Sequence, residues 1–214
     1  ARLVHPNVVG VHAVGELNDL PYLVMDYIPG RSLASVLTER GAALGIDEAS
    51  FILDHICRGL GAIHAAGLVH RDLKPANVII GPGFRVAIAD LGISRGAGTP
   101  DPPGQPWGSG PPSSMAPEVR AGAWPGRELA ARGDIYSLGV MAYQLLTGRL
   151  PYRRAPIGGL CKPTPASHVR PELPSGVDQL IEEALELFPD RRIRSADAFR
   201  RALQQQAGDQ AEAD

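Results

Sequence analysis

One polar stretch, His70–Asn77 (HRDLKPAN), constrains this chain more than any other. It lies between an amphipathic run and a short apolar run, so we expect a loop between a helix and a strand. Such a loop can direct the carboxylate of Asp72, the ammonium of Lys74 and the amide of Asn77 at one point. Phosphoryl transfer needs a carboxylate to orient the attacking hydroxyl, a cation near the moving phosphate and oxygen ligands for Mg²⁺. A polar turn would explain the composition of the stretch but not its order.

Short apolar segments on both sides of this loop predict strands. Residues 8–14 and 22–25 flank an Asn-Asp turn signal and are expected to form a hairpin. Residues 78–80 and 85–88 are expected to be strands joined by a Gly-Pro-Gly turn.

Helical spacing predicts a long helix before the polar loop. Asp47 is the expected N-cap, and the helix should end near Ala66, with Gly67 just beyond it. The residues expected to face the core are Phe51, Ile52, Ile56, Leu60 and Ile63.

Capping residues indicate further helices. Ser32 is expected to cap a helix to about residue 40, and Ser195 a last helix to about residue 206. Asp134 is the expected N-cap of an apolar helix that closes at Gly148. Residues 177–188 form another amphipathic pattern.

The polar loop resembles the catalytic loop of the protein kinase family, H-R-D-L-x-x-x-N, and Lys74 resembles its serine/threonine branch. The resemblance implies that Asp72 is the catalytic base, that Lys74 contacts the γ-phosphate and that Asn77 binds metal. It implies an α+β fold, with a mainly α-helical large lobe and a remnant of the small lobe's antiparallel sheet.

The resemblance covers nearly the whole chain and implies its domain organisation. A partial kinase domain would occupy residues 1–206, with a small-lobe remnant and hinge at 1–28 and the large lobe at 29–206. A polar tail would follow at 207–214.

Further motifs follow in the family's order. Asp90-Leu91-Gly92 resembles D-F-G with Leu in place of Phe, which implies that Asp90 is the main Mg²⁺ ligand. Glu118 ends an A-P-E motif, and Arg192 lies in a P-x-x-R element as its expected ion-pair partner. Asp134 begins a D-x-x-S-x-G element, whose aspartate anchors the catalytic-loop backbone in the family.

The resemblance also implies a nucleotide site that uses ATP and Mg²⁺. Met25 would be the gatekeeper, and Asp26 to Ile28 the hinge that binds adenine through its backbone. Ile79 would be a further nucleotide contact. The expected acceptor is a protein with Ser or Thr hydroxyls.

A complete protein kinase has a Gly-rich loop, a strand lysine and a helix glutamate, and this sequence contains none of them. Because the chain starts at Ala1 inside an apolar segment, we interpret it as a fragment whose small lobe lies upstream, with a dimer as the alternative. Alone, it is expected to transfer phosphate poorly or not at all.

Two other functions remain open. Pro111 stands where the family has a Thr that bonds the catalytic Asp and Lys, and residues 149–174 are short and proline-rich, which favours an inactive pseudokinase or interaction module. A small-molecule phosphotransferase of the aminoglycoside type shares an H-x-D-x-x-x-x-N loop, but the A-P-E and D-x-x-S-x-G motifs argue against it.

Regulation is expected in the segment 96–114, whose Gly and Pro content predicts a mobile loop. In the family, an arginine at the position of Arg71 pairs with a phosphorylated residue of this segment. Thr99, followed by Ser109, is the hypothesised modification site.

Composition sets outer limits on function. The 214 residues and net charge of −2 fit one large domain and argue against nucleic acid as a partner. Two cysteines, Cys57 and Cys161, are too few for a disulfide framework and indicate a reducing compartment. No apolar run has the length of a membrane span and no signal peptide opens the chain, so a cytoplasmic location is expected. The high Ala, Arg and Pro content suggests a bacterial signalling protein.

Overall fold

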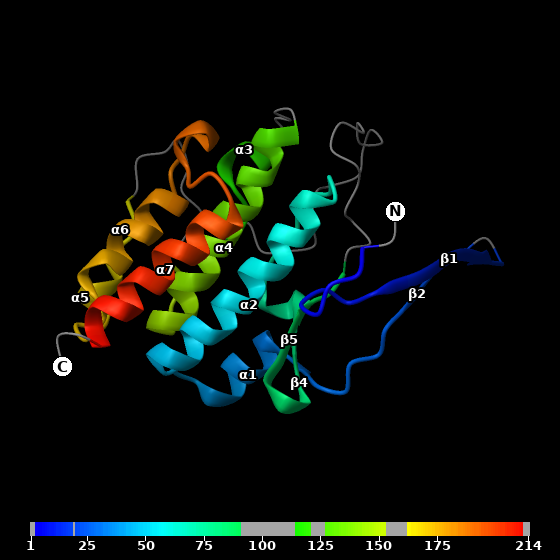
Figure 1. Cartoon of the computed structure of the whole chain (residues 1–214), viewed down its shortest axis with the longest axis horizontal. Coiled ribbons are helices and arrows are strands. Elements are labelled where there is room, and N and C mark those ends of the chain that lie inside the picture. Colours follow the sequence, from blue (N-terminus) through cyan, green and yellow to red (C-terminus); the bar gives the residue numbers. More distant parts are fainter. Residues whose placement is uncertain (1–2, 19, 91–113, 121–126, 153–161, 212–214) are drawn as a thin grey trace.

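A computed structural model describes the chain except for residues 1–2, 19, 91–113, 121–126, 153–161 and 212–214. A helical body carries most of the described residues, a small sheet packs against it, and a hairpin extends from one side (Figure 1). The helices are α1 (Leu33–Arg40), α2 (Ile46–Ala65), α3 (Pro117–Arg120), α4 (Arg127–Thr147), α5 (Ala166–Val169), α6 (Ser175–Ala184) and α7 (Ala196–Ala211). This arrangement agrees with the predicted α+β class.

Helix α4 forms the centre of the body. Nearly every residue from 130 to 147 is buried, including the charged Arg132 and Asp134. Helices α2 and α6 pack against α4, and α7 lies across α2 and α6. Because α4 is enclosed on all sides, its few polar side chains must find partners inside the protein.

Helix α2 confirms most of the predicted core stripe. Ile52, Ile56, Leu60 and Ile63 are all buried, whereas Phe51 is 41% exposed. The prediction for Phe51 was wrong because the Phe84 ring, which meets it edge-on with the centroids 6.4 Å apart, is itself 78% exposed and does not bury it. The Phe51 ring also lies 4.2 Å from that of His55, centroid to centroid.

The start of α2 also differs from the prediction. The N-cap is Gly45, so Asp47 lies in the first turn with Glu48. Carboxylates in the first turn are favourable beside the positive end of the helix dipole, which explains why Asp47 looked like a cap. Gly67, with φ of 83°, follows the end of the helix as predicted.

The other predicted helices are present, α1 with the predicted end at Arg40 and α6 and α7 with shifted ends. The Ser32 side chain accepts a hydrogen bond from the Ser35 backbone, and Ser195 Oγ accepts one from the Ala198 N–H at 3.1 Å, so both caps are confirmed. Helix α6 ends at residue 184 rather than 188, and α7 continues to residue 211 rather than 206. The proposed domain boundaries, including the tail at 207–214, stay predictions.

Asp134 is not an N-cap. Helix α4 begins at Arg127 and continues past Asp134 to Thr147, where Gly148 ends it with φ of 71°, as predicted. The carboxylate of Asp134 is therefore not used by its own helix.

The strands form two separate sheets. β1 (Val11–Leu17) pairs with β2 (Leu20–Met25) in an antiparallel hairpin, with the first strand starting three residues later than predicted. β4 (Val78–Gly81) lies between β3 (Arg31–Ser32) and β5 (Arg85–Ile88) in an antiparallel three-stranded sheet. The polar loop thus lies between α2 and β4, as predicted.

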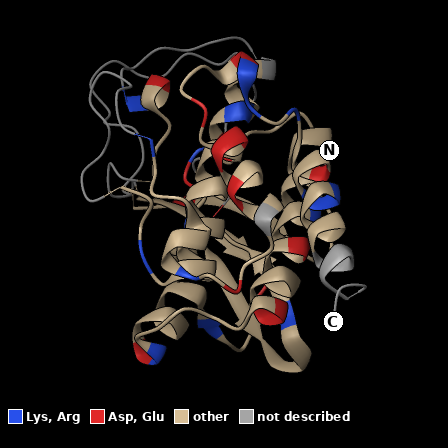
Figure 2. Cartoon of the chain, turned by 90° about the vertical axis from the view of Figure 1, so that its left-hand side faces the viewer, with Lys and Arg blue, Asp and Glu red and all other residues tan. Residues whose placement is uncertain are grey.

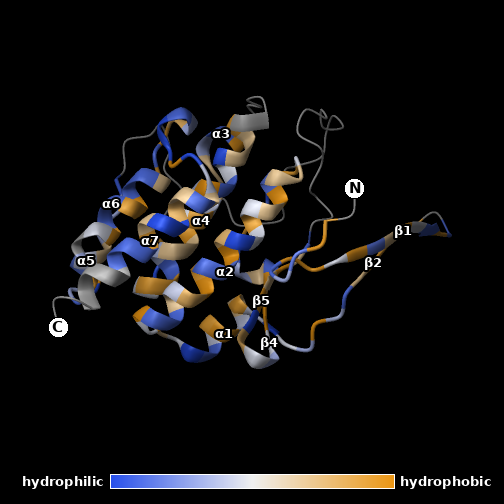
Figure 3. Ribbon diagram, in the orientation of Figure 1, coloured by the Kyte–Doolittle hydropathy of each residue, from blue (hydrophilic) through white to orange (hydrophobic). Residues whose placement is uncertain are grey.

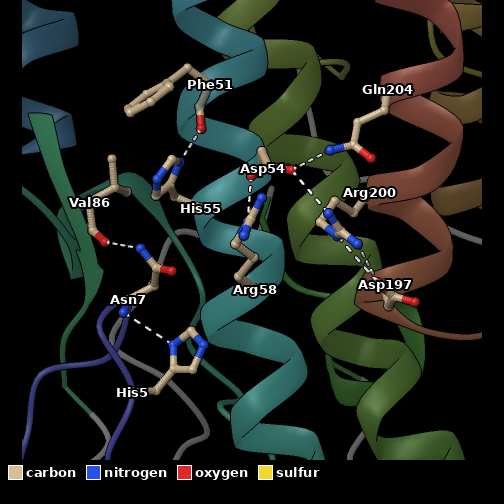
Figure 4. A network of polar contacts seen from close by, with 10 residues as sticks. All are labelled: His5, Asn7, Phe51, Asp54, His55, Arg58, Val86, Asp197, Arg200 and Gln204. Atoms are coloured by element: carbon tan, nitrogen blue, oxygen red, sulfur yellow. Dashed lines mark hydrogen bonds and ion pairs between the residues drawn. The ribbon is translucent and has the colours of Figure 1, made fainter.

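The segment before β1 is bound to the large body. Asn7 Nδ2 donates to the Val86 carbonyl at 2.8 Å (Figure 4), and the Ile88 N–H donates to the Asn7 carbonyl at 2.9 Å. Val8 bridges to Ile88, so this residue belongs with β5 rather than with the hairpin. A Cβ on Gly59 of α2 would come within 2.4 Å of the Asn7 carbonyl oxygen, which shows how closely the segment lies on the helix.

A polar network joins α2 to α7. Asp54 accepts from Arg58 Nε at 2.6 Å and from Gln204 Nε2 at 2.9 Å, and it lies 3.5 Å from Arg200 (Figure 4). Elsewhere, acidic and basic residues are interspersed along the helices (Figure 2). Within the described ranges, none of the helices combines the length and apolar character needed to cross a lipid bilayer.

The β1–β2 hairpin has little contact with the helical body. It extends away from the helical body (Figure 1), and hydrophobic residues run along it (Figure 3). Val14, Leu17 and Leu20 are 75%, 66% and 70% exposed. A two-stranded hairpin is marginally stable in water without a covered face.

We therefore expect the hairpin amides to exchange with solvent much faster than those of β4, β5 and α2 in this chain. Native-state hydrogen exchange followed by mass spectrometry measures the difference. Equal protection of the hairpin and α2 would contradict the expectation.

Candidate active site

Three side chains of the polar loop converge, as the sequence predicts. Lys74 Nζ lies 2.7 Å from Asp72 Oδ2, and Asn77 Nδ2 donates to the same oxygen at 3.1 Å. Asn77 Nδ2 also donates to the Asp72 backbone carbonyl at 2.8 Å. A turn of 3₁₀-helix over Pro75–Asn77 makes this return possible, because it brings Asn77 back over Asp72.

These hydrogen bonds leave Oδ1 of Asp72 and the side-chain oxygen of Asn77 available to a ligand. Both donors occupy Oδ2 of Asp72, and no described residue donates to Oδ1. Asn77 uses its amide nitrogen on Asp72, so its side-chain oxygen is the atom left for a cation. The Asp72 side chain is only 3% exposed, which strengthens its interaction with the Lys74 ammonium.

The backbone of the loop is fixed by Asp134 of α4. One carboxylate oxygen of Asp134 accepts from the His70 N–H at 2.8 Å, and the other from the Arg71 N–H at 2.7 Å. Arg71 has φ of 70°, a left-handed conformation that costs free energy in a non-glycine residue. The two bonds hold the backbone in that conformation, so the contacts fit the anchor role that resemblance implies for Asp134.

The charge of Asp134 is held by its surroundings. Burial raises the pKa of this carboxyl, but the hydrogen bond from His64 Nε2 at 2.8 Å, the charges of His64 and His70 and the His70 N–H lower it further. The net direction is a lowered pKa, so Asp134 stays ionised and accepts all three hydrogen bonds.

His70 connects the loop to the strand that leads to Asp90. Its Nε2 lies 3.0 Å from the Ala89 carbonyl, and the Asp72 N–H donates to its Nδ1 at 3.3 Å. The ring therefore bonds both the catalytic loop and the residue that precedes Asp90.

The two expected Mg²⁺ ligands lie at neighbouring strand ends. The Ala89 N–H donates to the Asn77 carbonyl at 2.8 Å, which places Asp90 directly after the residue paired with Asn77. Asp90 is exposed and has φ of 64°. One amide oxygen and one carboxylate are hard oxygen donors, so the residues fit Mg²⁺ completed by water and phosphate. Among the described residues, no cluster of three or more His, Cys, Asp or Glu side chains forms another metal site.

Of the expected nucleotide contacts, Ile28 and Ile79 lie together. Ile28 is 5% exposed and shares a small apolar cluster with Ile79, Val9 and Ala87. Met25 is 42% exposed at the end of β2, so simple core packing does not describe it.

Asp26 is engaged by its own neighbours. Its carboxylate accepts from the Gly10 N–H at 3.0 Å and lies 2.6 Å from His12 Nε2. The hydrogen bond from His12, followed by that from Gly10, lowers the pKa of Asp26. These bonds fix the segment between the hairpin and Ile28.

The Glu118–Arg192 ion pair is confirmed. The two guanidinium nitrogens of Arg192 lie 2.6 and 2.7 Å from the two carboxylate oxygens of Glu118, a bidentate arrangement. The Arg192 side chain is fully buried and also donates to the carbonyl of Glu186 at 2.7 Å.

Sequence reasoning missed Arg132. Its Nη1 donates to the Arg192 carbonyl at 2.7 Å, while Arg192 Nη1 donates back to the Arg132 carbonyl at 3.0 Å. The signal was an arginine inside an otherwise apolar helical run, two residues before Asp134. Ser137 of the same helix donates to the Ser114 carbonyl at 3.0 Å, which fixes the start of the A-P-E segment.

Several predicted features lie outside the described residues. These are the Leu91-Gly92 part of the D-F-G-like motif, the hypothesised modification sites Thr99 and Ser109, and Pro111.

Comparison with known proteins gives the family. The family described as the protein kinase domain matches residues 1–205, so the chain belongs to that family. This confirms the resemblance and the fold class.

Curated relatives carry serine/threonine-protein kinase names. The chain is 36% identical to Pkn1 of Myxococcus xanthus and 38% identical to PksC of Streptomyces coelicolor, with 94% of the chain aligned in each case. It is 35% identical to PknA of Mycobacterium tuberculosis over 95% of the chain. It covers 29%, 38% and 48% of the three relatives, less than half of each.

We expect Glu118→Ala to destabilise the chain by about 3–5 kcal/mol, because it leaves the buried Arg192 guanidinium without its carboxylate. Urea unfolding followed by circular dichroism measures this change. The matched control is Arg191→Ala, which removes an exposed guanidinium that lies 5.0 Å from the centroid of the Phe188 ring and should cost about 1 kcal/mol or less. Similar losses in both variants would contradict the assignment of the buried pair.

Asp134 should make the free energy of unfolding depend on pH in the acidic range. Because its pKa is lowered in the folded chain, its contribution is complete above the unfolded value of about 3.9 and is lost as the pH falls through the folded value. The difference in unfolding free energy between wild type and Asp134→Asn should be largest at neutral pH and narrow below about pH 4. A difference that does not change with pH would show that the carboxylate charge is unimportant.

Proposed function

We propose that the protein containing this chain is a serine/threonine kinase that transfers the γ-phosphate of ATP to protein hydroxyls. The observation that carries the proposal is the arrangement around Asp72, where Lys74 and Asn77 occupy one carboxylate oxygen and leave the other for a substrate hydroxyl. The names of the relatives support the same reaction class.

Asp72 and Lys74 have different roles in the proposed transfer. Oδ1 of Asp72 accepts the hydrogen bond of the attacking hydroxyl and orients its lone pair toward the phosphorus. Lys74 fixes the carboxylate through Oδ2 and places a positive charge where the transferred phosphoryl group carries negative charge. Asn77 holds the geometry by bonding both the backbone and the side chain of Asp72.

ATP and Mg²⁺ are the cofactors we propose for this site. Asn77 and Asp90 would hold Mg²⁺, which supplies neutralisation of phosphate charge when it is bound. Ile79, half-buried beside the buried Ile28, is the apolar contact we propose for the adenine ring. Met25 and the backbone of Asp26 to Ile28 are the further nucleotide contacts that the family resemblance implies. The buried free thiol of Cys57 is compatible with a cytoplasmic, reducing environment.

A non-catalytic interaction module is the second candidate. The observation that favours it is the hairpin, which exposes Val14, Leu17 and Leu20 to solvent and offers two strand edges for pairing. The intact bonding of Asp72 favours the kinase, because an interaction module has no chemical need for it.

The test uses the full-length protein with ATP, Mg²⁺ and a mixture of Ser- and Thr-containing peptides. Asp72→Asn should lower kcat by about 10²–10⁴-fold while ATP affinity, measured by calorimetry, changes little. Asp190→Asn, an exposed aspartate in the large lobe, is the control and should keep full activity. Wild-type ATP binding without any peptide phosphorylation would favour the interaction module.

A further inference from the structure

A cavity of about 460 Å³ opens beside the catalytic loop. It lies between α1, the loop after Lys74 and the end of α4. Its size falls within the range of pockets that bind small ligands. Its apolar wall is formed by Ala34, Leu37, Ala42, Pro75, Ala76 and Leu150.

The described lining of the cavity contains little charge. Lys74 is the one ionisable side chain in that lining, and its ammonium is already bound to Asp72 Oδ2 at 2.7 Å. Glu39, the single acid of α1, is not part of this lining and is paired with Arg31. A basic side chain would be desolvated there without a counterion, and an acidic one would compete with Asp72 for Lys74.

The cavity adjoins the proposed reacting centre. Lys74 bonds Asp72 and also lines the cavity, and Pro75 and Ala76 carry the same wall onward. Ser114, which precedes the A-P-E segment, closes another side and is fixed by Ser137. Because an extended residue spans about 3.3–3.6 Å, a polypeptide with its hydroxyl at Asp72 reaches the cavity within a few residues.

We propose that this cavity binds an uncharged apolar side chain of the protein substrate, of the Leu, Ile, Met or Phe type, within a few residues of the acceptor Ser or Thr. The proposal rests on the kinase function proposed above and adds to it a substrate class. The lining explains the choice, because burial of apolar surface is favourable there and burial of a charge is not.

The test is a peptide library scanned at each position around a fixed acceptor, phosphorylated by the full-length protein with ATP and Mg²⁺. At one position near the acceptor, Leu or Phe should exceed Asp, Glu and Arg by about ten-fold or more in kcat/KM. Direct binding of the same peptides, followed by fluorescence anisotropy, should show the same order without requiring transfer.

Ala34→Asp should change this preference. The residue lies in the first turn of α1, where a carboxylate is favourable, so the variant should fold. The new acid supplies a counterion that the described lining lacks, and Arg or Lys should become the preferred residue at that position. The control is Ser35→Asp, which adds the same charge at the next, exposed position outside the cavity lining and should keep the apolar preference.

Phosphorylation or binding without any apolar preference, or with a preference unchanged by Ala34→Asp, would overturn the inference and leave the kinase proposal intact. Absence of transfer to every peptide, with the apolar binding order preserved, would overturn the kinase proposal and support the cavity as a peptide site.

Discussion

The carboxylate of Asp134 is the interaction on which the rest of the site depends. It lies in the centre of the molecule on α4 and accepts two backbone N–H groups of the catalytic loop and one nitrogen of His64. A buried carboxylate is costly unless its oxygens are satisfied, and here three donors satisfy them. The most enclosed helix of the large lobe therefore sets the backbone of the loop that carries Asp72.

Arg71, held by Asp134 with φ of 70°, is one of two left-handed residues of the site. The other, Asp90, has φ of 64° and lies just beyond the Ala89 carbonyl that His70 contacts. Such conformations persist where the surroundings determine them. The other described non-glycine residues with positive φ, Asn18 and Phe84, lie at the connections between paired strands.

The sequence was sufficient for the order of the elements, because that order depends on local patterns. The hairpin, the two strands after the loop and the caps at Ser32 and Ser195 were predicted in this way and are present. The Glu118–Arg192 pair is also present, but it joins distant parts of the chain, and its prediction came from the resemblance to the kinase family. Local patterns fail where a distant element decides the outcome. Asp134 has the residue type of a cap, yet Arg127 extends the helix in front of it and the loop takes its carboxylate.

Contacts with distant elements also determine the solvent exposure of side chains that the sequence predicted incorrectly. Phe51 has core spacing, but the Phe84 ring beside it is itself exposed and does not bury it. Met25 ends a strand whose residues are mostly exposed. Val8 pairs with Ile88 instead of continuing the hairpin, because the neighbouring Asn7 side chain is hydrogen-bonded to β5. The cavity beside Lys74 arises from three segments far apart in the chain, so no single stretch of sequence indicates it.

The close approach of Asn7 to Gly59 has a consequence for how this chain tolerates mutation. Most positions on the surface of a helix accept a range of side chains, but any Cβ at Gly59 would meet the Asn7 carbonyl oxygen at 2.4 Å. Even alanine, the best helix former, would push the segment off α2 and break its pairing with Ile88. The residues that position 59 of α2 tolerates are therefore limited by the backbone of Asn7. A larger residue at position 59 would require the segment around Asn7 to move as well.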